Sequence, residues 1–309
     1  MHHEVTKCPY VVGNTIELHL NTPHDGQTTK AKIIKVFEPF TLSCVMVVRL
    51  EYPDFDMEGD LVLKLFDRRF ATQLREDEKI HPWTLDIEER YHQFILDDGA
   101  EKNIQMLNTN SESRSEESGT RNDAQNEAYA HDRSADFYKS EIRAYRTLKD
   151  IQGTEVPKHY ACVTLPTSHE ASMRQYADIP GILLQHIEGF RLVDLAAHAP
   201  RESWQYICED AIRIVNICTD RGILNLDVRT RSFIIERIRE DKFKPVMIDF
   251  ALCRFREDFD SEEDWRLRKS GADEEGAIGR YMQTILQGGF DYHHDAYNLK
   301  LDEEFKMEG

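Results

Sequence analysis

Four short stretches near the N-terminus constrain the fold more than any other part of the chain. They lie between residues 16 and 67, are rich in β-branched and aromatic residues, and read IELHL, AKIIKVFEPF, SCVMVVRLEY and DLVLKLFD. Such runs are typical of strands, and turn-prone segments such as NTPHDG separate them. Links this short favour antiparallel neighbours, because parallel strands need a long crossover. The sequence therefore predicts a β-rich, antiparallel N-terminal part.

The segment from residue 76 to residue 135 differs in character. It holds 15 acidic and 6 basic residues, a net charge of −9, which is half of the −18 of the whole chain. Its run NTNSESRSEESGTRNDAQNEAYAHDRSA is polar and rich in serine, so burial of its few apolar groups does not offset its ordering entropy. We expect a disordered acidic insertion at about residues 100–135.

The second half alternates helical and strand-like patterns. Apolar residues recur at helical spacing in DFYKSEIRAYRTLKDIQG and WQYICEDAIRIVNICTDRG, and EEGAIGRYMQTIL is a further predicted helix. Strand-like runs are YACVTL, GILLQHI, SFIIER and KPVMIDF.

Charge and cysteine content limit the possible partners and compartments. A net charge of −18 argues against nucleic-acid and membrane-surface partners, because both are anionic. The six cysteines are scattered and favour reduced thiols in the core. The start MHHEVTKCPY has no apolar signal core. We expect an intracellular protein, cytoplasmic or nuclear.

Two carboxylates adjoin apolar, strand-like runs in the second half. Asp227 stands in LNLDVRTRSF between two apolar runs, and Asp249 follows the apolar residues of MIDF. The segment between them has about the length of one hairpin, so both acids can reach one cleft. One acid would then orient a nucleophile and the other would bind a divalent metal. A pair of structural acids in turns or caps is the alternative.

Lys64 lies within the apolar run LVLKLF, where a buried charge is costly without a partner. Strand alternation puts its side chain on the face opposite to those of Leu63 and Leu65. Glu141, on the helix expected after the insertion, is a candidate partner. Lys64 is then either a phosphate ligand or one half of a buried structural ion pair.

In chain order, these residues resemble the motifs of the protein kinase superfamily, and in particular the divergent kinase-like proteins of fungi. Lys64 resembles the nucleotide-binding lysine and Glu141 the helix glutamate that pairs with it, while ILLQHIEG resembles the hinge after the gatekeeper position, here Leu184. NLDVRTRS occupies the place of the catalytic loop, and IDFA occupies that of the metal-binding motif. The apparent match spans about residues 31–280.

Several positions depart from the family pattern. Asn225 and Leu226 replace the His and Arg before the catalytic aspartate, and Ser232 replaces the metal-binding Asn. Ala251 stands where the family has Gly, and FEPFTLSCV contains no glycine where a glycine-rich loop would cover the phosphates. No A-P-E follows, which implies a reduced substrate-binding part.

The resemblance implies an α+β, bilobal protein kinase-like fold, with an N-terminal antiparallel β-lobe and a reduced, mainly helical C-terminal lobe. We expect an N-terminal extension at residues 1–30, an N-lobe with its acidic insertion at residues 31–183, and a short C-lobe and tail at residues 184–309.

The resemblance also implies transfer of the γ-phosphoryl group of Mg-ATP to a hydroxyl acceptor, either a protein or a small molecule, with ATP and Mg²⁺ as cofactors. The alternative is a pseudokinase, a nucleotide-binding or protein-interaction scaffold without phosphotransfer. Asp227 is the predicted catalytic residue, and Asp249 and Ser232 are the predicted metal ligands. The predicted nucleotide-binding residues are Lys64, Glu141, Val45, Val62, Leu184, Gln185, Ile187 and Ile234; on composition alone, Val45, Val62 and Ile234 are equally core residues.

A thermal-shift titration with ATP, with and without Mg²⁺, separates the two functions. A competent phosphotransfer site binds the nucleotide through the metal, so Mg²⁺ should increase the rise in melting temperature that ATP causes. If Mg²⁺ causes no such increase, the protein is instead a scaffold.

Overall fold

The computed structural model describes residues 7–21, 27–53, 57–109, 121–168 and 170–305. The chain divides into two compact units. Unit 1 comprises Met1–Lys139 and His159–His186, and unit 2 comprises Ser140–Lys158 and Ile187–Gly309. One long helix, α5 (Asp123–Thr147), contributes residues to both units.

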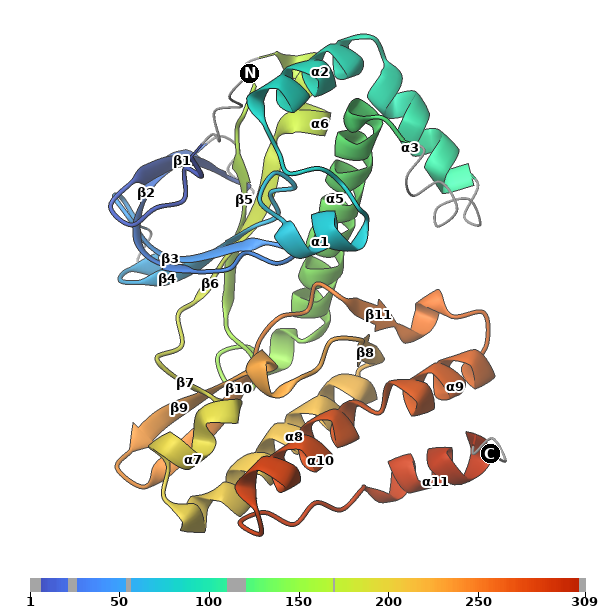
Figure 1. Cartoon of the computed structure of the whole chain (residues 1–309). Coiled ribbons are helices and arrows are strands. Elements are labelled where there is room, and N and C mark those ends of the chain that lie inside the picture. The colour runs from blue at the N-terminus through green and yellow to red at the C-terminus, as the bar shows by residue number, and fades with distance from the viewer. Residues whose placement is uncertain (1–6, 22–26, 54–56, 110–120, 169, 306–309) are drawn as a thin grey trace. The chain divides into compact units, whose positions relative to one another are not determined.

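Unit 1 is built around a closed barrel of six antiparallel strands (Figure 1). The strand order is β1-β2-β3-β4-β6-β5, and β5 pairs back with β1 through His19 and Leu20. Every neighbouring pair is antiparallel. The strands are β1 (Thr15–Leu20), β2 (Gln27–Phe37), β3 (Cys44–Leu50), β4 (Leu61–Leu65), β5 (His159–Leu165) and β6 (Ile179–Gln185).

Alternating side chains fill the interior of the barrel. On β4, Leu61, Leu63 and Leu65 belong to the inner core, whereas Val62 and Lys64 point to the outer face. This confirms the face predicted for Lys64. The other inner positions include Leu18, Ile33, Cys44, Met46, Val48, Val163 and Leu183. Each fully buried Leu or Ile contributes roughly 1.5–3 kcal/mol, so this apolar interior is a main source of stability in unit 1.

The closed barrel shows that the expected bilobal protein kinase-like fold is wrong. That fold requires an N-terminal lobe built on an open sheet, but here strand β1, from the segment expected as an extension, pairs with both β2 and β5 and leaves no open edge. Alternation within a strand is the same in an open sheet and in a closed one. The sequence pattern therefore could not reveal the closure.

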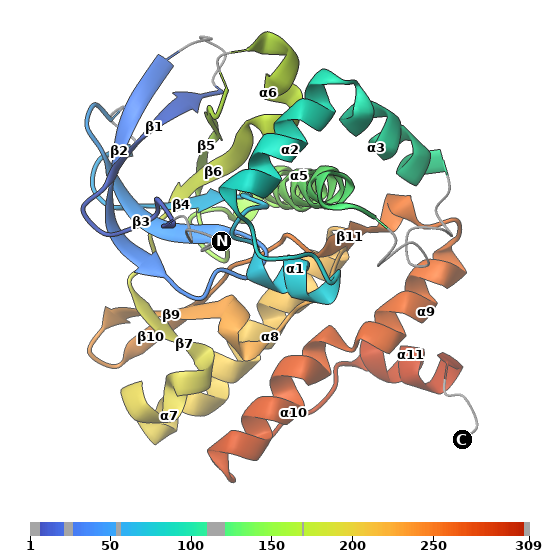
Figure 2. The ribbon, with the colours of Figure 1, turned by 45° about the horizontal axis from the view of Figure 1, so that its top comes forward.

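In the described part of unit 1, four further α-helices accompany the barrel and α5. Helices α2, α3 and α6 pack with the first part of α5 around a second apolar cluster, and Figure 2 shows α2 and α3 as consecutive helices beside α5. The cluster consists of Tyr91, Ile95, Ala100, Ala128, Met173 and Ala177. The helices are α1 (Thr72–Asp77), α2 (Leu85–Leu96), α3 (Gly99–Thr109) and α6 (Ala171–Ala177).

The disordered insertion expected at about residues 100–135 is largely helical. Helix α3 covers its start and α5 begins at Asp123, while residues 110–120 lie outside the described residues. Ala100, Leu107, Ala128 and Tyr129 are buried, so the segment has more apolar contact area than its polar composition indicates. Two alanines and the larger Leu107 and Tyr129 provide this contact.

A buried ionic cluster joins the end of β4 to helices α1, α2 and α5. Glu127 of α5 is paired with Arg68 and with Arg75, and all three side chains are almost fully buried. Arg68 also binds both carboxylate oxygens of Glu88 at 2.8 Å. Burial alone would raise the pKa of Glu88, but the Arg68 charge and hydrogen bonds that include one from Trp83 hold it well below its ordinary value.

Unit 2 combines helices with two small antiparallel sheets. Strands β7 (Gly189–Arg191), β9 (Phe233–Arg239) and β10 (Lys242–Met247) form one sheet in the order β10-β9-β7, and β8 (Ile223–Asn225) pairs with β11 (Cys253–Phe255) in the other. Helix α8 has one apolar, buried face, and it lies beside α10 (Figure 1). The helices are α7 (Leu195–His198), α8 (Trp204–Asp220), α9 (Glu262–Ala272), α10 (Glu274–Leu286) and α11 (Ala296–Phe305).

None of the helices in the described part of the chain is both long enough and apolar enough to cross a membrane.

Replacing Glu88 by Gln should lower the free energy of unfolding by about 2–3 kcal/mol near pH 7, because buried Arg68 then loses a charged partner. The pKa of Glu88 is lower in the folded protein, so its stabilising effect is complete above the unfolded-state pKa of about 4.3. The effect is lost as pH falls through the folded-state pKa. Urea unfolding near neutral pH and again in acid measures both properties.

Glu89→Gln is the matched control, because Glu89 is the exposed neighbour of Glu88 on α2. Equal unfolding midpoints for the two variants at neutral pH would contradict a stabilising role for the Arg68–Glu88 pair.

Candidate functional site

Asn225, at the end of β8, connects the loops that carry the two predicted acids. Its side-chain Nδ2 donates a hydrogen bond to the carbonyl oxygen of Asp249 (2.9 Å), and its Oδ1 accepts one from the backbone N–H of Asp227 (3.0 Å). The Asn225 residue is only 2% exposed. The structure therefore brings the backbones of Asp227 and Asp249 together on one buried amide within unit 2.

A buried ion pair holds Asn225 in turn. The Nζ of Lys269 lies 2.8 Å from Oε2 of Glu274, and both side chains are 1% exposed. Glu274 uses Oε1 to accept the backbone N–H of Asn225 at 2.8 Å, while Lys269 also donates to Thr219. Burial raises the pKa of Glu274, although the Lys269 charge opposes this shift. Each polar group of the pair is thus hydrogen-bonded, as buried charges require.

Asp227 follows this anchor and is paired with two arginines of its own loop. Its Oδ1 lies 2.8 Å from Nε of Arg229, and its Oδ2 lies 3.0 Å from Nη2 of Arg231. The arginine side chains are 63% and 51% exposed, respectively. Ion pairs with such exposed partners contribute at most about 1 kcal/mol each. Either arginine can therefore leave Asp227 for another anion at little cost.

Ser232, a predicted metal ligand, is buried and binds the same loop. Its hydroxyl accepts the backbone N–H of Arg229 at 3.2 Å and donates to the carbonyl oxygen of Asp227 at 3.3 Å. Its own carbonyl accepts the N–H of Ile248, which lies just before Asp249. In this arrangement the Ser232 hydroxyl shapes the loop, and its role as a metal ligand stays a prediction.

Asp249 is exposed and has a left-handed backbone conformation, with φ of 71°. Few residues other than Gly adopt this region, and strained positions of this kind cluster at functional sites. The next residue, Phe250, is fully buried and packs edge-on against Tyr145, with ring centroids 5.4 Å apart. Ser140 donates to the carbonyl oxygen of Cys253 at 2.9 Å. The segment after Asp249 is thus anchored on the end of α5.

Glu141 is fully buried on the part of α5 that belongs to unit 2. Burial raises the pKa of Tyr145 well above its ordinary value, and the charges of Glu141 and Asp249 raise it further. These two predicted site residues therefore lie within electrostatic range of the same tyrosine.

Four of the predicted nucleotide-binding residues share the outer face of the barrel in unit 1. Val45 lies opposite Lys64 on the neighbouring strand, and Val62 lies opposite Leu184. Lys64 is 6% exposed, and its Nζ lies 5.5 Å from the centroid of the Phe66 ring. A lysine among apolar side chains is thus present on this face, as predicted. Its pairing with Glu141 would join different units and stays a prediction.

The other three predicted nucleotide-binding residues lie elsewhere. Gln185 pairs with Leu61, whose side chain lies on the inner face of the barrel. Gln185 is therefore on the inner face, whereas Leu184 is on the outer face. Ile187 and Ile234 belong to unit 2 and are partly buried; Ile234 pairs with Val246 in the β9–β10 ladder. Their nucleotide-binding roles stay predictions.

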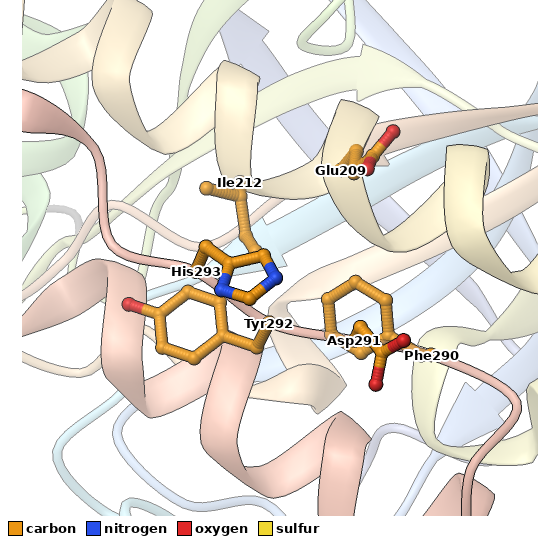
Figure 3. A pocket seen from close by; sticks show the side chains of 6 residues that line it. All are labelled: Glu209, Ile212, Phe290, Asp291, Tyr292 and His293. Atoms are coloured by element: carbon orange, nitrogen blue, oxygen red, sulfur yellow. The ribbon is translucent and has the colours of Figure 1, made fainter.

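Within the described ranges, no three side chains of His, Cys, Asp or Glu come together as a metal site. A small pocket of about 130 Å³ opens in unit 2 between α8 and the chain after α10 (Figure 3). It contains none of the predicted site residues. Its lining consists of Glu209, Ile212, Phe290, Asp291, Tyr292 and His293.

Sequence reasoning missed Asn225, Lys269 and Glu274 as parts of this site. Asn225 attracted notice only as a departure from a family motif. A signal for Lys269 was present, because it follows Trp265 by four residues and so shares the buried face of α9. No local pattern links this lysine to Asn225, because Glu274 provides the connection through the tertiary fold.

Replacing Asn225 by Ala should lower the free energy of unfolding by about 2–4 kcal/mol, because it leaves the Asp227 N–H and the Asp249 carbonyl without this partner. Asn216→Ala is the control, since Asn216 makes one partly buried side-chain hydrogen bond at 3.3 Å, to Asp295. Chemical denaturation of both variants measures the difference. An Asn225→Ala protein no less stable than the control would mean that the amide does not hold the two loops.

Comparison with known proteins assigns no family. No model of a known protein family matches the chain, and no curated protein matches it significantly. The functional proposal therefore depends on the geometry of the site itself.

Proposed function

We propose that this chain is an ATP-dependent phosphotransferase that transfers the γ-phosphoryl group of Mg-ATP to a hydroxyl acceptor. The observation that carries the proposal is the Asn225 side chain, which binds the backbones of Asp227 and Asp249 together. Phosphoryl transfer depends mainly on positioning and on neutralisation of charge. Two acids whose backbones are joined by one buried amide support the first of these requirements.

Asp249 is assigned to the divalent metal. Its carboxylate is a hard oxygen ligand of the kind that Mg²⁺ prefers, and its residue is exposed. Mg²⁺ would supply charge neutralisation at the phosphates when it is bound. The left-handed backbone of Asp249 and the buried Phe250 beside it restrict the conformations that this ligand can adopt.

Asp227 is assigned to the acceptor. Its carboxylate would orient the acceptor hydroxyl and take its proton, while the hydroxyl oxygen bonds to the γ-phosphorus and the bond to the ADP oxygen breaks. Arg229 and Arg231 are exposed and only weakly held by Asp227, so either can turn to a phosphoryl oxygen. In that position an arginine would neutralise charge on the phosphoryl group during transfer.

Lys64 keeps its predicted role as a ligand of the α and β phosphates. The apolar neighbours Val45, Val62 and Leu184 on its face of the barrel suit an adenine ring, which is flat and largely apolar. Its ammonium group carries the positive charge with which a phosphate oxygen can pair.

A nucleotide-binding module without transfer is the alternative. One observation favours it: both carboxylate oxygens of Asp227 have an arginine partner in this structure. In such a module the loop would be a structural ion-pair cluster, and Asp227 would take no proton.

Asp227→Asn should reduce the turnover of Mg-ATP by about 100-fold or more, because an amide cannot accept the acceptor's proton. Binding of Mg-ATP, measured by thermal shift, should change little. Release of ADP from ATP in the presence of Mg²⁺ measures turnover without a known acceptor, since water or the protein's own hydroxyls can accept the phosphoryl group.

Asp241→Asn is the matched control, because Asp241 is an exposed acid of unit 2 in the turn between β9 and β10.

Asp249→Asn should remove the Mg²⁺-dependent part of the ATP-induced stabilisation. Wild-type protein that binds Mg-ATP but releases no ADP would support the binding module and overturn the transferase.

A further inference from the structure

Cys162 and His159, both on β5 of the barrel, form a cluster that the proposed function does not use. The Sγ of Cys162 lies 3.8 Å from Nε2 of His159, and both side chains are partly exposed. We propose that Cys162 is a modification site: a nucleophilic thiol that soft carbon electrophiles alkylate, with His159 as the acceptor of its proton.

A β-bulge creates this pair. Residues three apart in a regular strand point to opposite faces, so His159 and Cys162 would be separated by the sheet. On β5, however, His159 pairs with Leu184 whereas Ala161 pairs with Leu183. Tyr160 is therefore an extra residue in the strand, which shifts His159 to the other face.

Both members of the pair now lie on the outer face of the barrel. Cys162 pairs with Ile182, which in turn pairs with Lys64 on the outer face. His159 pairs with Leu184, which is on that same face. Bulges often reorient a side chain beside a functional group. Here the bulge brings a base next to a thiol.

The pair has the chemistry for nucleophilic substitution. The reactive form of cysteine is the thiolate, and a neutral imidazole with its proton on Nδ1 can accept the thiol proton at Nε2. The sulfur then forms a bond to the electrophilic carbon, and the bond from that carbon to its leaving group breaks. The leaving group departs with the electron pair, and the proton stays on His159.

The other five cysteines differ from Cys162 in exposure or in their surroundings, so their alkylation rates serve as references within the same protein. Cys44, Cys208, Cys218 and Cys253 are buried, so a reagent in water reaches them poorly. Cys8 is partly exposed, like Cys162. Burial raises the pKa of the Cys8 thiol, and the Asp67 and Glu38 charges raise it further. Cys8 is thus a thiol of comparable exposure whose own surroundings disfavour its ionisation.

Limited alkylation of the native full-length chain with iodoacetamide, followed by peptide mass spectrometry, measures the rate at each cysteine. Near pH 7, Cys162 should react at least about tenfold faster than Cys8. His159→Asn should reduce the Cys162 rate to about that of Cys8. The Cys8 rate in the same molecules should not change, which excludes a general loosening of the barrel as the cause.

The pH dependence of the wild-type rates provides a second test that needs no variant. An unassisted thiol gains about tenfold in rate per pH unit below its pKa, so Cys8 should show a steep rise from pH 6 upward. Transfer of the thiol proton to the neighbouring imidazole should give Cys162 a shallower rise over the same range. Equal rates near pH 7, or parallel pH profiles for the two thiols, would overturn the proposal.

Discussion

The ion pair between Lys269 and Glu274 determines where the candidate site can be. Two charges that are each 1% exposed are stable in the interior only if every donor and acceptor finds a partner. Glu274 satisfies this condition partly through the backbone N–H of Asn225, and so fixes the end of β8. The Asn225 side chain then positions the backbones of Asp227 and Asp249. The backbones of the two acids are therefore held by a buried amide and, through it, by a buried ion pair.

In this arrangement, the side chains that stabilise the loops are different from those proposed to take part in the reaction. Buried groups hold the loops, while the carboxylate of Asp249 and the arginines beside Asp227 remain accessible. Exposed ion pairs are weak, and a ligand can replace them without disturbing the buried partners. A site that must bind a metal and a phosphoryl group, and then release the product, benefits from this division, because its supporting groups stay in place through the cycle.

Unit 1 relies on buried charges in a similar way. Arg68, which follows β4, pairs with Glu127 of α5, and Glu127 also pairs with Arg75 of α1. These ion pairs, together with the Arg68–Glu88 pair, connect the barrel to α1, α2 and α5. The outer face of the barrel carries the less regular features, which are the buried Lys64 and the bulge that brings His159 beside Cys162. A closed barrel tolerates such a bulge because its other strands maintain the ladder on both sides.

Local patterns predicted the strands of the barrel, the placement of Lys64 on the face opposite to Leu63 and Leu65, the amphipathic helix α8, and two acids in loops next to apolar strands. These features follow from periodicity, which depends only on near neighbours in the sequence. Closure of the barrel depends on the pairing of His19 and Leu20 with Thr164 and Val163, residues far apart in the chain. The order of the supposed insertion depends on burial of Ala128 and Tyr129 by other elements. The sequence by itself determined which residues alternate and where charges interrupt apolar runs. Only the tertiary structure decided which distant partners satisfy those charges, because a buried hydrogen bond is specified by position in space and not by spacing along the chain.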